Sequence, residues 1–250
     1  MNAVAAVWRR DVLRTLRNKA VMVSALLIPG LFLLAFHAAF SRSAADLGID
    51  YADYLLPTAM MQAIIFTAGG SALAVARDAE EGIHSRLRTM PAPMWAVAAG
   101  RVLADLTRMA WSGGIVLALS LALGARIRGG IGGILVMLLI FALVTAIIAA
   151  GVDGLCLLSA KPVSTALLFQ SLTIIILMFS TAFVPAEALP DALAPVIRHV
   201  PVSPILETIR ARMAGDPAGA AGVEAAAWLV ALAGAAGWGF VHALSRRSHA

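Results

Sequence analysis

The residues best suited to do chemistry lie between residues 77 and 101, the longest strongly charged run in an otherwise apolar chain. A helix over residues 78–90 would hold acidic side chains in its first turn and basic side chains in its last turn, where they oppose the helix dipole. The acidic residues are Asp78, Glu80 and Glu81, and the basic residues are Arg86 and Arg88. This pattern favours a charged helix outside the membrane.

The same helix would carry an apolar stripe, because Ile83, Leu87 and Met90 recur at helical spacing. Pro91 and Pro93 would end it, since proline has no amide proton and restricts the residue before it. Two interpretations stay open at this point. The stripe docks in a groove of another protein, or it rests on lipid headgroups as part of an ordinary loop.

Other motifs give little sign of enzymatic chemistry. A G-x-x-x-x-G-K-[ST] phosphate loop is absent, because neither Lys19 nor Lys161 follows a glycine. The five histidines are scattered without metal-ligand spacing, so no metal site is expected. Ser71 follows two glycines and, with His242, superficially resembles an intramembrane serine hydrolase; close packing of small residues between helices is the preferred interpretation.

Composition indicates an integral membrane protein. Of the 250 residues, 61% are hydrophobic and 13% are charged, and the mean hydropathy is +0.89, whereas soluble domains average about 25% charged residues. The net charge is +5, but the basic residues flank apolar runs instead of forming one face. A nucleic-acid partner is therefore not expected.

The elements that must position these residues are six apolar runs, each near the roughly 20 residues needed to cross a bilayer. They cover about residues 20–40, 54–76, 102–124, 131–152, 163–184 and 223–244. Cytoplasmic segments would hold about twice as many Lys and Arg residues as outer segments if both termini are inside. The sequence therefore predicts an all-α, six-span protein with cytoplasmic termini.

Two flanking segments complete the prediction. Residues 1–19 read as an amphipathic helix in the membrane surface, with Arg10, Arg14 and Arg17 on the face opposite Val4, Trp8, Val12 and Leu16. Residues 185–222 hold six of the eleven prolines, which would split the segment into short helices near 191–199 and 205–213. Pieces this short cannot span, so a cap or a re-entrant hairpin is expected.

Polar residues in or beside the spans are further candidates. The spacing of Arg101, Asp105 and Arg108 allows a local charge pair at the cytoplasmic rim. Two sets of residues within the spans each share one face of a helix. They either line a translocation path or form hydrogen bonds between helices. They are Gln62 with Phe66, and Gln170 with Thr173 and Leu177.

The charged run resembles the cytoplasmic loop of ABC type-2 transporter permeases, particularly the daunorubicin-resistance branch. The residues that carry the resemblance are Asp78, Glu80, Glu81, Gly82, Arg86, Leu87, Met90, Pro91, Gly100, Arg101, Leu103 and Asp105. The proline-rich segment is similar to the outward re-entrant helices between spans five and six of that family.

The resemblance implies a single permease domain over residues 1–250 that is not itself an enzyme. It implies a dimer with a second copy or a paralogue, and two copies of a separate ABC ATPase subunit that binds ATP and Mg. Residues 77–101 would be the coupling loop, and spans two and five would flank a cavity at the dimer axis. The expected function is export of hydrophobic or amphiphilic small molecules or lipids across a bacterial inner membrane, as in multidrug or antibiotic resistance. The alternatives are an intramembrane serine hydrolase and an ion-coupled secondary transporter.

Overall fold

The computed structural model describes residues 3–46, 48–80, 94–185, 189–190 and 192–248, and within these residues every regular element is an α-helix. The helices are α1 (Ala3–Arg17), α2 (Lys19–Asp46), α3 (Tyr51–Glu80), α5 (Met94–Ala122), α6 (Gly130–Leu158), α7 (Pro162–Met178), α8 (Ala194–Arg198), α9 (Val202–Ala214) and α10 (Gly219–Ser248). The all-helical fold expected from the sequence is confirmed for this part of the chain.

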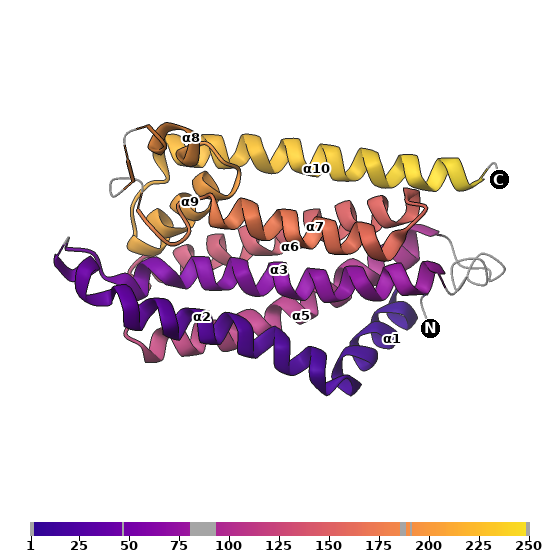
Figure 1. Ribbon diagram of the computed structural model, residues 1–250, viewed down its shortest axis with the longest axis horizontal. Coiled ribbons are helices and arrows are strands. Elements are labelled where there is room, and N and C mark those ends of the chain that lie inside the picture. The colour runs from indigo at the N-terminus through magenta and orange to yellow at the C-terminus, as the bar shows by residue number, and fades with distance from the viewer. Residues whose placement is uncertain (1–2, 47, 81–93, 186–188, 191, 249–250) are drawn as a thin grey trace.

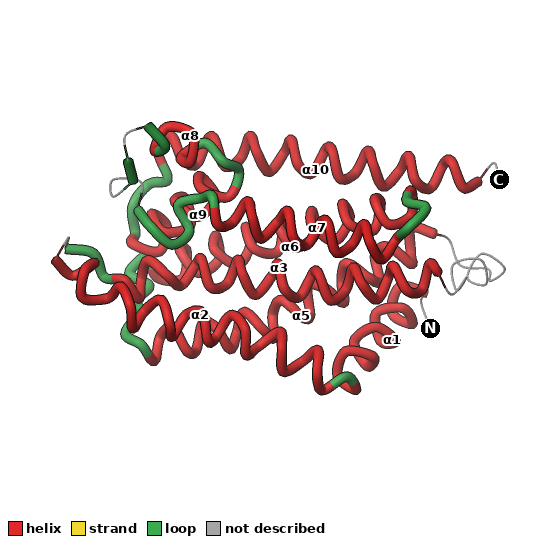
Figure 2. The backbone as a smooth tube through the Cα atoms, in the orientation of Figure 1, coloured by secondary structure: helices red, strands yellow, loops and turns green. Residues whose placement is uncertain are grey.

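The long helices run side by side along one axis, with α3 at the centre (Figure 1). Helix α3 packs against α2, α5, α6 and α7, and it supplies Leu56, Met60 and Ile64 to the buried core. Both chain termini lie at one end of the bundle, whereas α8 and α9 lie at the other end (Figures 1 and 2). We call these the terminal end and the opposite end.

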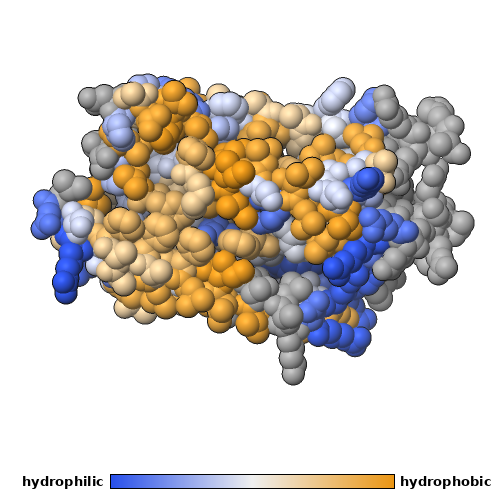
Figure 3. Space-filling view, in the orientation of Figure 1, coloured by the Kyte–Doolittle hydropathy of each residue, from blue (hydrophilic) through white to orange (hydrophobic). Residues whose placement is uncertain are grey.

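Among the described residues, five helices are long and apolar enough to cross a membrane. The qualifying segments are Leu27–Asp46, Tyr51–Asp78, Ala96–Ala122, Gly130–Leu158 and Gly219–His242. On the face shown in Figure 3, apolar residues cover most of the middle of the long axis and hydrophilic residues gather toward its ends. Five of the six expected runs therefore form helices of spanning length.

The expected fifth run, residues 163–184, forms a shorter apolar helix that ends at Met178. The chain beyond it turns, and side chains of α3 donate hydrogen bonds to its backbone carbonyls. Tyr51 donates to the Phe183 carbonyl at 3.0 Å and Thr58 to the Ala182 carbonyl at 2.5 Å. These bonds satisfy carbonyls that a continued helix would have paired internally, so the chain can leave helical geometry there.

Arg210 of α9 completes this junction at the opposite end. Its guanidinium donates to the carbonyls of Tyr54, Thr181 and Ala182 at 3.0–3.1 Å, and to the Thr58 hydroxyl at 3.0 Å. The guanidinium carbon also lies 3.6 Å from the centroid of the Tyr54 ring. A planar group with five donors is suited to bridging several acceptors while it stacks on an aromatic face. One side chain thus fastens α9 and the end of α7 to α3.

Several helix boundaries differ from the expected ones. Helix α3 continues through Glu80, so Asp78 lies in its last turn and does not begin a separate helix. Residues 94–100 belong to α5, which therefore begins before the expected run of residues 102–124. Asp153 was expected in a loop but is buried within α6. The two outer helices occur as α8 and α9, of which α8 is shorter than expected.

Replacing Arg210 tests the junction. Arg210→Ala is expected to lower the apparent melting temperature of the detergent-solubilised protein by about 5 °C or more, because it removes charge-assisted hydrogen bonds, worth about 1.5–3 kcal/mol each, that join α9 to α3 and to the chain after α7. Arg212→Ala, two residues along the same helix, is the control and should change little. Equal melting of the two variants would show that the Arg210 contacts do not hold the junction.

Candidate functional site

An ionic network joins α1, α3, α5 and α6 toward the terminal end of the bundle. It contains four basic and four acidic residues: Arg10, Arg14, Arg101 and Arg108 with Asp11, Asp78, Asp105 and Asp153. We call this set the ionic network. All four of its carboxylates are buried, so each depends on a partner to stay charged in a weakly polar environment.

The first part of the network connects α1 to the end of α3. Asp78 is only 2% exposed, and its carboxylate accepts a hydrogen bond from Arg14 at 2.7 Å and lies 3.6 Å from Arg10. Arg10 also pairs with Asp11 at 2.9 Å. Arg10 and Arg14, which the sequence places on the polar face of α1, therefore contact Asp78 of α3 while their side chains stay 38% and 48% exposed. The position of α1 in the membrane surface stays a prediction.

Arg108 of α5 is the centre of the second part. Its guanidinium pairs with Asp105 one turn earlier, and donates to the Thr15 hydroxyl at 2.8 Å and the Ser71 hydroxyl at 3.2 Å. A further bond of 3.3 Å reaches the Asp11 carbonyl. One arginine thus links α5 to both α1 and α3. Of the two pairings that the sequence spacing allowed for Asp105, the structure contains the one with Arg108.

The third part joins α5 to α6. Arg101 lies 3.7 Å from the Asp153 carboxylate, and both side chains are less than 10% exposed. This distance is too long for a hydrogen bond. Among the described residues, no group accepts a hydrogen bond from the Arg101 Nη2 atom, which is buried. Arg101 is therefore a buried cation whose donors are only partly satisfied.

A close approach of α1 to α5 places these charges within reach of each other. A Cβ atom at Gly100 would lie 2.8 Å from the Val7 Cβ and 2.9 Å from the Val4 carbonyl oxygen, so only glycine fits without moving α1. Farther along the same contact, the Trp8 indole donates to the Thr107 hydroxyl at 3.0 Å. Gly100 thus has a packing role, while Arg101 and Asp105, which follow it on α5, supply charges to the network.

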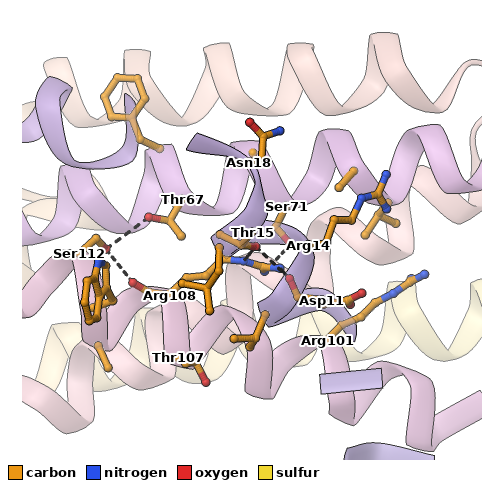
Figure 4. Close-up of a pocket in the computed structure, with 18 of the residues that line it drawn as sticks. Asp11, Arg14, Thr15, Asn18, Thr67, Ser71, Arg101, Thr107, Arg108 and Ser112 are labelled. Carbon is orange, nitrogen blue, oxygen red and sulfur yellow. Dashed lines mark hydrogen bonds between the residues drawn. The ribbon is translucent and has the colours of Figure 1, made fainter. Parts of the chain in front are cut away.

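A cavity of about 600 Å³ lies beside the network, between α1, the start of α2, α3 and α5. Its polar residues include Asp11, Arg14, Asp78, Arg101 and Arg108 (Figure 4). Its apolar residues include Leu16, Ile28, Phe66, Val75 and Trp111. A cavity with one charged side and one apolar side can hold an amphiphilic molecule.

The expected path residues do not gather around this cavity. Phe66 lines it, whereas Gln62 is buried in the bundle and Gln170 of α7 lies directly against Gly69. Thr173 donates to the Phe169 carbonyl of its own helix at 2.8 Å, and Leu177 is part of the buried core. Only one of the five expected path residues therefore borders the cavity.

Most of the expected coupling residues lie outside the described residues. These are Glu81, Gly82, Ile83, Arg86, Leu87, Met90 and Pro91. Asp78 and Glu80 are described, the first in the ionic network and the second exposed at the end of α3. The expected stripe of Ile83, Leu87 and Met90 stays a prediction.

Two ion pairs of the network could not be predicted from the spacing of residues in the sequence. Arg14 and Asp78 are separated by 64 positions, and Arg101 and Asp153 lie on different helices. An aspartate at the end of an apolar run was the only available sign that a distant cation would be needed. Within the described residues, no group of three metal-ligating side chains is close enough to hold a metal ion.

Long apolar helices packed side by side, with charges buried toward one end, are typical of a polytopic membrane protein. Comparison with known proteins is consistent with this class. Residues 2–213 match the ABC-2 type transporter family, and the chain belongs to that family.

Curated relatives come from two bacterial genera. The chain is 27% identical over 198 residues to the daunorubicin resistance ABC transporter permease protein DrrB1 of Streptomyces coeruleorubidus. This alignment covers 78% of this chain and 69% of the relative. The chain is 25% identical over 219 residues to the probable doxorubicin resistance ABC transporter permease protein DrrC of Mycobacterium tuberculosis strains CDC 1551 and H37Rv. Those alignments cover 86% of this chain and 76% of each relative. The similarity to daunorubicin-resistance permeases that the sequence indicated is confirmed.

Gly100 provides a test of how α1 is held on the bundle. Gly100→Val is expected to push α1 away from α5, because even a Cβ atom there would lie within 3.0 Å of Val7 and Val4. We expect a lower melting temperature and faster proteolysis within α1. Gly114→Val is the matched control on the same helix, since no described atom lies within 4 Å of a Cβ at Gly114. The close approach would be unimportant if both variants matched the unsubstituted protein.

Proposed function

We propose that this chain is the membrane-spanning permease subunit of an ATP-driven exporter that moves hydrophobic or amphiphilic small molecules or lipids out of the cell. The observation that carries the proposal is the ionic network, which ties four helices together at the last turn of α3 and along the first half of α5, the helices that flank residues 81–93 in the chain. Membership of the ABC-2 family and the drug-resistance relatives support the same function.

The proposed layout has six spans, with α7 and the turn after it as the fifth. Helices α8 and α9 are proposed to re-enter the outer side of the membrane without crossing it. Both termini lie at the same end of the bundle (Figure 1), and the excess of basic residues supports a cytoplasmic location for that end. A bacterial inner membrane is the setting that the relatives suggest.

Energy is proposed to come from two copies of a separate ABC ATPase subunit, which bind ATP and Mg. The sequence of this chain contains no phosphate-binding loop of its own. A second copy of the chain, or a paralogue, would complete the permease dimer. The contact with the ATPase is proposed to be residues 77–101, with the apolar stripe of Ile83, Leu87 and Met90 in a groove of the partner.

The ionic network suggests how movement at this contact reaches the spans. A push on residues 81–93 acts on the last turn of α3 and the first turn of α5, the elements on either side. Asp78 then carries the movement to α1, and Arg101 carries it to α6. Because buried ion pairs are costly to separate, the four helices would move together and change the shape of the cavity. Gln62, Phe66, Gln170, Thr173 and Leu177 stay proposed path residues.

The serine hydrolase alternative has weaker support. The Ser71 hydroxyl accepts a hydrogen bond from Arg108, and an arginine stays protonated in proteins, so it cannot serve as the general base that a serine nucleophile needs. His242, the expected partner of Ser71, stacks on Trp238 of α10. The secondary-transporter alternative also has weaker support, because the chain belongs to the ABC-2 type transporter family.

The proposed docking stripe is tested with Leu87→Asp. A buried leucine contributes about 1.5–3 kcal/mol, so its loss lowers partner affinity about tenfold or more, and a carboxylate in the groove adds a desolvation cost. We expect the ATPase to be lost from co-purification and ATP-dependent transport to stop, with the permease still inserted in the membrane.

Arg88→Ala is the control, because an exposed charge contributes at most about 1 kcal/mol. It should keep both the ATPase and transport. If Leu87→Asp also retains them, the stripe lies on lipid and the proposed coupling contact is wrong.

A further inference from the structure

The cavity beside the ionic network has features that the transport proposal does not use. It is bounded by α1 and the start of α2 on one side and by α3 and α5 on the other. Trp111 and Leu16, which line it, are 62% and 50% exposed. Trp111 lies on α5, a helix of spanning length, whereas Leu16 lies on the shorter α1. Exposed apolar side chains at such positions can contact lipid tails. Charged residues of the ionic network line the rest of the same cavity and form its polar wall.

The charge that this polar wall offers to a ligand is positive. The Asp78 side chain is 4% exposed and is covered by arginines, whereas the Arg14 side chain is 48% exposed. Arg101 and Arg108 add two further guanidinium groups to the lining. The most exposed charged side chain of the lining is therefore an arginine, Arg14.

Arg101 supplies an independent sign of a missing acceptor. The residue is 5% exposed and lines the cavity, yet its Nη2 atom has no hydrogen-bond acceptor among the described residues. Its nearest carboxylate, on Asp153, is beyond hydrogen-bond distance. Buried guanidinium donors are normally satisfied, and leaving one unpaired is costly. A ligand oxygen at this wall of the cavity would satisfy it.

We propose that this cavity binds the anionic headgroup of a membrane amphiphile, with a phosphate or carboxylate on Arg101 and Arg14 and an apolar tail along Trp111 and Leu16. Guanidinium groups form short, paired hydrogen bonds with phosphate and carboxylate oxygens. Anionic lipids are concentrated where basic segments meet the membrane surface. The site is a property of the resting protein and does not depend on export, so its test needs neither ATP nor the ATPase.

The test compares two tryptophans that are both strongly exposed. One variant keeps only Trp111, which borders the cavity, and the other keeps only Trp238, which is 72% exposed on α10; the remaining tryptophans become phenylalanine. Each variant is placed in phosphatidylcholine nanodiscs. Acyl-chain spin-labelled phosphatidylglycerol or spin-labelled phosphatidylcholine is then added, and quenching of tryptophan fluorescence is measured.

The anionic lipid is expected to quench Trp111 at a roughly tenfold lower mole fraction than the zwitterionic lipid, the preference expected from one charge-assisted hydrogen bond. Trp238 should show no such preference. The same preference at both tryptophans would mean ordinary contact with surrounding lipid, and would overturn the proposal. Stronger quenching of Trp111 by a spin-labelled cationic lipid would show that the cavity does not prefer anionic headgroups, and would also overturn the proposal.

Substitutions in the Trp111 variant assign the preference to Arg101. Arg101→Gln alone leaves Asp153 buried without its partner, so it is combined with Asp153→Asn to keep the protein folded. The double variant should lose the preference for phosphatidylglycerol. Arg42→Gln removes an exposed arginine at the far end of α2, and should keep it. Retention of the preference in the double variant would show that Arg101 is not the binding group.

A soluble anion is the other source of the same chemistry. Inorganic phosphate, compared with chloride at equal ionic strength, is expected to leave the quenching of Trp111 unchanged, because it lacks the tail that the apolar wall holds. Complete displacement of the labelled lipid by inorganic phosphate would identify a phosphate site and contradict the amphiphile proposal. A failure of export with the lipid preference intact would count against the proposed function alone.

Discussion

The fold depends on one electrostatic constraint, which is that charges buried among apolar helices must find partners on neighbouring helices. Four carboxylates and four guanidinium groups lie together toward the terminal end of the bundle. Removing one member of a buried pair costs about 3–5 kcal/mol, whereas a complete pair adds little net stability. The network therefore adds little to the free energy of unfolding, but it makes separation of the four helices costly. That property suits a part of the protein that transmits movement between helices.

The two ends of the bundle are held by different chemistry. At the terminal end, ion pairs join α1 to α3 and α5 to α6, and hydrogen bonds of Arg108 join α5 to α1 and α3. At the opposite end, Arg210 and the side chains of α3 bind the backbone carbonyls beyond α7. Between them the core is apolar and includes Met137, Phe141 and Ile64. Helices fastened at both ends and packed by non-directional contacts in the middle can tilt together without losing their partners.

Sequence reasoning recovered the helices better than the site. Apolar runs of spanning length set the positions of five long helices, and the separation of Asp105 and Arg108 by three residues allowed their ion pair. The pairs of Arg14 with Asp78 and of Arg101 with Asp153 depend on how helices pack, which no local pattern encodes. The end of α7 was also missed, because its exit from helical geometry is stabilised by Tyr51, Thr58 and Arg210 from elsewhere in the chain. Amphipathicity placed Arg10 and Arg14 on one face of α1 but could not indicate Asp78 as their partner.

The central claim is that the ionic network carries the movement of the coupling segment into the spans. It is tested most directly by the number of substrate molecules moved per ATP hydrolysed, measured in proteoliposomes that contain the permease and its ATPase. Asp78→Asn removes one charge and leaves behind two arginines that reach water, so folding should survive. The account predicts that ATP hydrolysis continues while transport per ATP falls about tenfold, with Asp46→Asn, exposed at the far end of α2, unaffected. Transport per ATP that stays unchanged in Asp78→Asn would contradict the account.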